Sequence, residues 1–392
     1  MHWYSHGESK GRYIGHTSSF DVYERTISVR QKQKEQEPPD QSFPEEIVFN
    51  YGPSTGGLME SVNFRITTPG ELISKVRVNS AFKRRAVKIS GRRIDEAAMV
   101  VERINGFHSA SNTICFLNAV EDALNIKTPK EVQMARIACI ELERIRSHLT
   151  VIERLCSDAS FGVPHNSIAA LREEVSRLIG DMAGHRYMFG IHGVGSISGS
   201  YSAVPERLVY VADQFRELLD SLLQSKIFLN RLQGNGITRD EWLVGPAARA
   251  SGIRVDSRLE SAFLPYDDLN FQPVTRYESD AFGRFMIRSQ EIFSSVGLIE
   301  RALDQNPDTL HEEQEAPNGT GEGAARLESP PGDIFYYVKV RDGYLEKVEM
   351  ISPGHCNVNA FMNSIKGNIL TDFPFNWDSF GIWISEMEVE LE

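Results

Sequence analysis

Four long segments of this chain carry apolar residues at helical spacing, and they constrain its fold more than any other feature. They span residues 128–158, 166–190, 205–232 and 278–304. In the first segment the apolar residues recur at intervals of four, three and four: Ile145, Leu149, Ile152 and Cys156. An apolar stripe of this length has to be buried against another element, and several such helices are typical of a bundle core.

The start of the first long segment has the residues of a helix N-terminus. Thr128 is followed by Pro129, and Glu131 stands three positions after the threonine. This order predicts a capping box, with Thr128 as the N-cap and proline at the first helical position.

Two other stretches predict β-structure. Residues 46–79 contain short alternating runs around Gly-Pro and Pro-Gly turns, which indicates a small antiparallel sheet. Residues 333–353 alternate on both sides of Asp342-Gly343, a dipeptide that favours a tight hairpin. The expected fold class is therefore α+β and mainly α: a long-helix bundle core, a small N-terminal antiparallel sheet and a C-terminal β-hairpin region.

Composition suggests one domain with two irregular segments. Residues 1–45 are polar, without an apolar period, and we expect an arm or linker there. Residues 46–392 form the predicted domain, and residues 305–326 are expected to be a flexible insertion rich in polar residues and glycine.

Charge and hydropathy exclude several classes of protein. The net charge of −12 argues against a nucleic-acid-binding protein, which needs a basic face. The basic residues of 82–93 (Lys83, Arg84, Arg85, Lys88, Arg92 and Arg93) are expected to form a solvated face or a subunit contact. The sequence contains no run of about 18 apolar residues, so we expect no membrane-spanning helix. The N-terminus lacks the apolar region of a signal peptide. The four cysteines stand singly, which predicts reduced core residues.

The stretch VERINGFHSASNT (residues 101–113) resembles the first nickel-binding motif of group 4 nickel–iron (NiFe) hydrogenase large subunits. The chain also resembles the 49-kDa-type subunit of complex I, which has the same fold. Further matching stretches follow in the same order: KTPKEVQMARIACIELERIRSHL, AGHRYMFGIHG, LVGPAARASGI, YDDLNF, LESPPGDIFYYV and NSIKGNILTDFPFNWDSFGIW. The resemblance covers about residues 45–388, and it is specific because the motifs are collinear.

The resemblance also shows where this chain departs from the hydrogenases. Their NiFe centre is held by four thiolates, because soft metals need soft anionic ligands. Those positions correspond here to Asn105, His108, Phe380 and Trp383. Asp378 matches the family's aspartate, whereas Ala86 and Pro331 stand where family members have a proton-transferring glutamate and an arginine near the metal. We therefore expect no NiFe centre and no metal bound by this chain.

The complex I resemblance assigns roles to three other residues. Arg103 and His148 match residues that face the terminal iron–sulfur cluster of the adjacent small subunit, where a cationic or hydrogen-bonding neighbour raises the potential of the cluster. Asp158 matches an aspartate of the quinone cavity. The quinone-binding tyrosine corresponds to Gly106, and the quinone-binding histidine is absent from the stretch near Gly56, so the use of quinone or NAD(H) stays open.

The residues by themselves allow simpler interpretations. Arg103 could pair with Glu102 or Glu96 on a helix surface, and His148 could be a hydrogen-bonded core histidine. His108 could fill the space of a cysteine and bond locally. Asp158 could cap a helix end.

Together these observations predict the large subunit of a membrane-associated, complex I-like or hydrogenase-like oxidoreductase, peripheral on the cytoplasmic face. The implied partners are an iron–sulfur small subunit, a 30-kDa-type subunit and membrane-arm subunits that move ions, with no nucleic acid. The candidate catalytic residues are Asp158 and His108. The alternative is a catalytically silent scaffold, which is favoured if Phe380 and Trp383 fill the former metal position.

Overall fold

The computed structural model describes residues 13–23, 27–29, 46–304 and 317–392. The α-helices are α1 (Ile94–Val101), α2 (Ser109–Leu124), α3 (Lys130–Asp158), α4 (Gly162–Ala183), α5 (Val204–Gln224), α6 (Lys226–Leu232), α7 (Gly245–Ala250), α8 (Ala281–Leu303), α9 (Gly354–Ser364), α10 (Phe373–Phe380) and α11 (Ile384–Met387). Short 3-10 helices are η1 (Ala81–Lys83), η2 (Gly106–His108), η3 (Tyr266–Leu269) and η4 (Leu370–Asp372). The strands are β1 (Tyr13–His16), β2 (Phe20–Tyr23), β3 (Ile27–Val29), β4 (Ile47–Tyr51), β5 (Asn63–Thr68), β6 (Lys75–Asn79), β7 (Arg85–Val87), β8 (His192–Gly193), β9 (Ser196–Ile197), β10 (Gly321–Ser329), β11 (Gly332–Arg341), β12 (Tyr344–Ile351) and β13 (Val389–Leu391).

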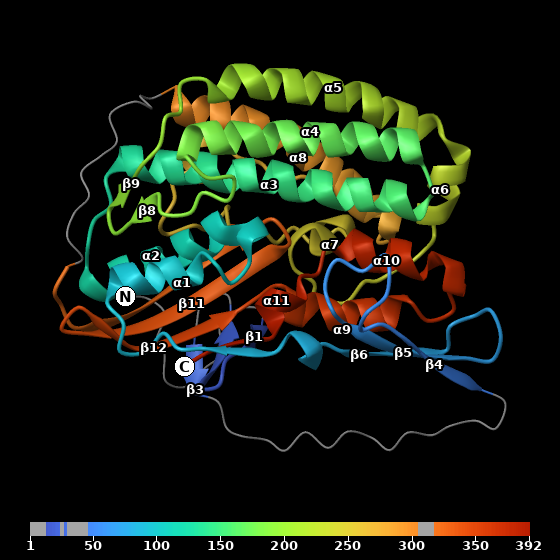
Figure 1. The fold of residues 1–392 in the computed structure, drawn as a ribbon, viewed down its shortest axis with the longest axis horizontal. Helices are drawn as coiled ribbons and strands as arrows, with labels where there is room; N and C mark the ends of the chain where they lie inside the picture. The colour runs from blue at the N-terminus through green and yellow to red at the C-terminus, as the bar shows by residue number, and fades with distance from the viewer. Residues whose placement is uncertain (1–12, 24–26, 30–45, 305–316) are drawn as a thin grey trace.

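The long helices form one layer of the molecule. Figure 1 shows α3, α4, α5 and α8 running side by side at the top, with the sheets and the short helices below them. Helix α3 lies at the centre of the bundle, against α8, α4 and α10, and most of its residues are buried, charged ones included. The prediction of an α+β, mainly α fold is confirmed. Among the described residues, the structure shows no helix long and apolar enough to cross a membrane.

The predicted hairpin is confirmed and belongs to a larger sheet. Strands β11 and β12 join through Asp342 and Gly343, whose φ angles of 52° and 78° fit a tight hairpin turn. Strand β10 adds a third, antiparallel strand, and α2 packs on this sheet. The contact is close because β10 has glycines: a Cβ at Gly323 would lie 2.3 Å from the carbonyl oxygen of Ala119.

The predicted N-terminal sheet is also confirmed. Strands β4, β5 and β6 form an antiparallel sheet that builds a second hydrophobic core with α9 and α10. Phe64 lies at its centre, with its ring centroid 4.9 Å from that of Phe373 and 4.7 Å from that of Trp377. This second core is where α10, which carries Asp378 and Phe380, is anchored.

Two expectations about irregular segments need correction. Strands β1 and β2 fall within the segment predicted as a polar arm, and their residues Ile14 and Val22 are buried against Phe335 and Ile351. Residues 1–12, 24–26 and 30–45 lie outside the described part of the chain, as do residues 305–316 of the predicted insertion. The predicted insertion is too long, because Gly321 already begins strand β10.

Two expectations about helix ends are wrong as well. The segment 205–232 divides into α5 and α6 at Ser225, whose extended backbone interrupts the helix and whose side chain accepts a hydrogen bond from the backbone N–H of Phe228. At the start of α3 the N-cap residue is Pro129, without a side-chain cap. The hydroxyl of Thr128 donates instead to the carboxylate of Glu121, at 2.7 Å, so tertiary packing replaces the predicted capping box.

Candidate functional site

The loop between α1 and α2 carries Asn105 and His108, the first two positions expected to correspond to thiolate ligands of the hydrogenases. Asn105 caps η2, because its Oδ1 accepts a hydrogen bond from the N–H of Phe107 at 3.0 Å. His108 ends η2, and its side chain is fully buried. The loop is therefore a rigid element of the core.

The side chains of this loop bond to the C-terminal region of the chain. His108 Nδ1 lies 2.8 Å from Oε1 of Glu386, and its Nε2 lies 3.0 Å from the hydroxyl of Ser147. The same carboxylate oxygen accepts a hydrogen bond from Asn105 at 3.0 Å, and Asn112 Nδ2 lies 3.4 Å away. A buried carboxylate with several donors satisfies the imidazole and both amides without a metal.

The second pair of positions holds two aromatic side chains in different surroundings. The ring of Trp383 stacks on Phe107 with a centroid distance of 4.9 Å and meets His108 edge-on at 5.4 Å. Phe380 packs in the second core against Phe361, and the guanidinium of Arg284 lies 4.1 Å from its ring centroid. The structure thus brings Asn105, His108 and Trp383 together, whereas Phe380 packs in the second core.

The residues at these positions do not fit a NiFe centre. An amide, an imidazole bonded to a carboxylate, an indole and a phenyl ring replace the four thiolates that such a centre needs. The cysteines do not compensate, because Cys115, Cys139 and Cys156 lie elsewhere in the core and burial raises the pKa of each thiol, to about 12 for Cys139 and Cys156. Within the described ranges no group of three or more histidine, cysteine or acidic side chains is arranged to hold a metal ion.

Two buried arginines of α8 hold the C-terminal end of α10. Arg284 donates to the hydroxyl of Ser379 at 2.9 Å, and Arg288 donates to the carbonyl oxygen of Phe380 at 2.7 Å. Cations at a helix C-terminus stabilise it, because its last carbonyl groups carry partial negative charge. These contacts fix the turn at Gly381, which leads to Trp383.

His148 lies in the core between α3 and α8. Its Nε2 is 2.7 Å from Oε2 of Glu291, and its Nδ1 is 3.2 Å from Nη1 of Arg288. Burial lowers the pKa of His148 to about 3, although Glu291 opposes the shift. His148 is therefore a neutral, hydrogen-bonded core histidine.

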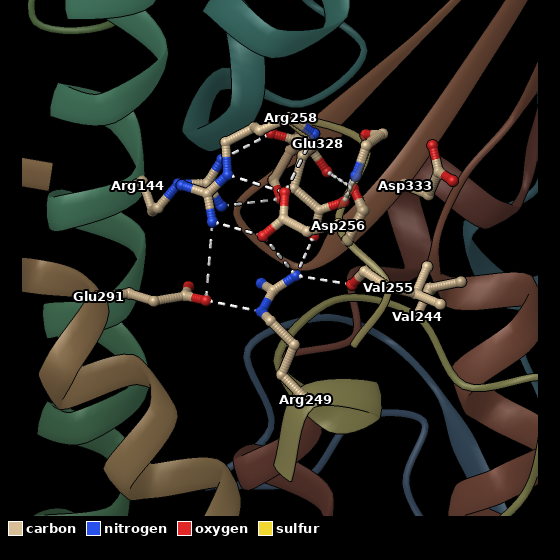
Figure 2. Close-up of polar contacts among 12 residues, drawn as sticks. Arg144, Val244, Arg249, Val255, Asp256, Arg258, Glu291, Glu328 and Asp333 are labelled. Atoms are coloured by element: carbon tan, nitrogen blue, oxygen red, sulfur yellow. Dashed lines mark hydrogen bonds and ion pairs between the residues drawn. The ribbon is translucent and has the colours of Figure 1, made fainter. Parts of the chain in front are cut away.

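Behind His148 lies a buried network of charged groups that no sequence motif indicated, and Figure 2 shows it. Glu291 lies 2.8 Å from Arg249, and Arg249 lies 2.7 Å from Glu328 and 3.0 Å from Asp256. Arg258 continues the network from Asp256, at 2.7 Å, to Glu141. The network joins α3, α7, α8 and β10, and each charge has an opposite charge beside it, as burial requires.

Arg103 lies at the surface. Its guanidinium donates to the buried carboxylate of Glu102 and, at 2.6 Å, to the carbonyl oxygen of Met99, and it lies 4.7 Å from the ring centroid of Phe189. The predicted pairing with Glu102 is confirmed. Arg103 also lines a surface groove of about 560 Å³ with Arg85, Val87, Arg92, Glu96, Met99, Val100 and Ile104. The basic residues around this groove are exposed, as expected for a solvated face.

Asp158 does not cap a helix; it is the last residue of α3 and faces Asp378 of α10. The interpretation as a cap is wrong, because α4 begins after Phe161 without a side-chain cap. Asp378 is buried, and its Oδ2 accepts a hydrogen bond from Nε of Arg154 at 3.0 Å. Burial and the neighbouring charge of Asp378 raise the pKa of Asp158 to about 8. No sequence signal pointed to Arg154 as the partner of this pair.

The predicted site residues thus fall into separate places. His108 and Asn105 share one hydrogen-bonded cluster with Glu386, Asp158 and Asp378 form a second cluster, and Arg103 lies in the surface groove. Glu386 has no recognisable motif around it, and only the fold reveals that it contacts His108.

Comparison with known proteins agrees with this architecture. The family described as "Respiratory-chain NADH dehydrogenase, 49 Kd subunit" matches residues 164–319. The membrane-bound hydrogenase alpha subunit of Pyrococcus furiosus is 28% identical over 357 residues, 83% of this chain and 83% of that relative. A subunit of the NADH-quinone oxidoreductase of Chlorobaculum tepidum is 25% identical over 376 residues, 88% of this chain and 92% of that relative.

A solved structure shares the fold. It is a chain of the membrane-bound sulfane sulfur reductase, an archaeal respiratory membrane complex, with a TM-score of 0.81 and 21% identity, covering 88% of this chain and 98% of that chain. These comparisons lead to one conclusion: along most of its length the chain resembles complex I 49-kDa-type subunits and the alpha subunit of membrane-bound hydrogenase.

Proposed function

We propose that this chain is the large subunit of a membrane-associated, complex I-like oxidoreductase that has lost the NiFe centre of its hydrogenase relatives. It is peripheral on the cytoplasmic face and packs against an iron–sulfur small subunit, a 30-kDa-type subunit and membrane-arm subunits. Electrons reach it from the cluster of the small subunit, and their transfer is coupled to ion movement in the membrane arm. The relatives support the assembly, because they are subunits of membrane-bound hydrogenase and NADH-quinone oxidoreductase.

The observation that carries the loss of the NiFe centre is the packing of Trp383 on the loop of Asn105 and His108. The indole stacks on Phe107 and touches the edge of His108, and Glu386 engages the imidazole and the amide. A metal bound between these positions would have to displace an aromatic ring from the core and break a buried carboxylate–imidazole bond. Even then, none of the side chains at these positions could supply a thiolate ligand.

Metal analysis of the purified complex tests this part of the proposal. We expect iron from the partner subunit's clusters and no nickel that copurifies with this chain in proportion to its amount. Nickel bound in equal amount to this chain, and retained through size-exclusion chromatography, would contradict it.

The role of Arg103 is tested on the partner's cluster. The guanidinium is exposed in a groove, where a neighbouring subunit can reach it. If it faces the cluster, Arg103→Ala removes a positive charge and lowers the midpoint potential of the cluster. Arg341→Ala, at a similarly exposed arginine of β11, is the matched control and should leave the potential unchanged. Equal potentials in both variants would rule out the contact.

A second candidate function, a catalytically silent scaffold, is favoured by the complete burial of Phe380 and the near-complete burial of Trp383. Rapid mixing separates the two candidates. The prereduced complex is mixed with a short-chain ubiquinone analogue or with polysulfide, and reoxidation of the partner's cluster is followed. Reoxidation that slows in Asp158→Asn supports the oxidoreductase, and a cluster that neither acceptor reoxidises supports the scaffold.

A further inference from the structure

The most unusual group of side chains outside the former metal position is the carboxyl pair of Asp158 and Asp378. Asp158 ends α3, and Asp378 lies on α10, which the second core and two arginines hold in place. Arg154, one helical turn before Asp158, contacts Asp378 Oδ2 through Nε and Nη2, both at 3.0 Å. The pair is therefore fixed by elements from distant parts of the chain.

One oxygen of each carboxyl group lacks a hydrogen-bond donor. Asp158 Oδ2 and Asp378 Oδ1 are both buried, and among the described residues neither has a partner. Two ionised carboxylates can only accept, so they cannot satisfy each other. With one proton on Asp158, the two groups form a hydrogen bond. A single proton thus removes an otherwise costly defect.

The charges around the pair also favour one proton on the two carboxyl groups. Arg154 is the cation that faces both carboxyl groups, and one guanidinium balances one carboxylate. Glu153 is also near Arg154, but it is paired with Arg172 at 2.6 Å. Two carboxylates beside one cation, Asp378 buried and Asp158 half-buried, would leave an uncompensated negative charge, which surroundings of low dielectric constant disfavour. The raised pKa of Asp158 has these causes, burial first and Asp378 second.

We propose that Asp158 and Asp378 share one proton at neutral pH, held between α3 and α10 beside Arg154. The inference deepens the proposed function and rests on it in one respect, which is the assignment of this proton to the reduction of an acceptor.

Infrared spectroscopy of the complex without reductant tests the shared proton. The difference spectrum between wild type and Asp158→Asn at pH 7 should contain the C=O band of one protonated carboxylic acid. The same band should be lost in Asp378→Asn, because Asp158 can then pair with Arg154 and ionise. Asp213→Asn, at an exposed aspartate of α5, is the control and should keep the band. Absence of the band in wild type, or its survival in Asp378→Asn, would overturn the shared proton.

Because no electrons are supplied, the infrared results do not depend on the proposed function. Nickel in the complex would contradict that function while leaving the band in place.

Discussion

His108 Nδ1 lies 2.8 Å from Oε1 of Glu386, although the two residues are 278 positions apart in the sequence. This bond ties the loop before α2 to α11 near the C-terminus. A buried imidazole–carboxylate pair and a stacked indole connect these two regions, so hydrogen bonding and packing hold them together.

The first prediction concerns this bond. Glu386→Ala leaves the donors of His108 and Asn105 buried without an acceptor, so we expect a loss of roughly 3 kcal/mol in the free energy of unfolding. Urea denaturation of the full chain measures it. Glu217→Ala, at an exposed position of α5, should change the stability by less than about 0.5 kcal/mol. Similar values for both variants would show that the buried bond contributes little.

The second prediction concerns the core around Phe380. Phe380→Ala removes a fully buried ring that packs against Phe361 and under Arg284. It should reduce the free energy of unfolding by about 3–5 kcal/mol, since the cavity can collapse only partly. Phe82→Ala, where the side chain is exposed, is the matched control. A loss below about 1 kcal/mol for Phe380→Ala would mean that the position is loosely packed.

A third prediction follows from the raised pKa of Asp158, about 8 against an ordinary value of 3.8. A carboxyl group with a raised folded-state pKa contributes stability below its unfolded pKa and loses this contribution as the pH rises toward 8. Wild type should therefore lose stability relative to Asp158→Asn between pH 4 and pH 8, by up to about 1.4 kcal/mol per pH unit. Parallel stability curves for the two proteins would contradict the shift.

The fourth prediction concerns His148, whose contribution to stability has the opposite pH dependence to that of Asp158. Its folded-state pKa is lowered from 6.5 to about 3, so its contribution is present above pH 6.5 and is lost as the pH falls toward 3. Between these values wild type should lose up to about 1.4 kcal/mol per pH unit relative to His148→Gln, which cannot take up a proton. Urea denaturation at pH 7 and pH 4.5 measures the difference. A difference that does not change with pH would show that the imidazole can ionise in the folded protein.

The last prediction tests the packing of α2 on the sheet. A Cβ at Gly323 would lie 2.3 Å from the carbonyl oxygen of Ala119 and 2.4 Å from the amide nitrogen of Ala123. Since backbone atoms cannot move aside cheaply, Gly323→Ala should lower the free energy of unfolding by about 1–3 kcal/mol. Gly70→Ala, which meets no atom within 4 Å, should have little effect. Thermal unfolding followed by circular dichroism compares the two.

The elements of the fold could largely be predicted, because their signals are local. The apolar stripe through Ile145, Leu149 and Ile152 marks a helix face, and Asp342-Gly343 marks a hairpin. The break at Ser225 has no such signal, since the helical pattern continues across it. The predicted cap at Thr128 is wrong, because Glu121, from another helix, takes its hydroxyl.

The site could be predicted only in part. The resemblance singled out Asn105, His108, Phe380 and Trp383 as the residues expected at the ligand positions. They could not show that Phe380 turns into the second core, or that Glu386 takes up the hydrogen bonds of His108 and Asn105.

The sequence by itself determined the resemblance to these subunits and the types of side chain at each motif position, because residue identity and order are what a motif records. Only the tertiary structure decided which of these groups meet, which are buried and which hold a proton. Asp158 and Asp378 are 220 positions apart, and neither has unusual chemistry alone. Burial beside each other and beside Arg154 raises the pKa of Asp158, and that surrounding is a property of the fold.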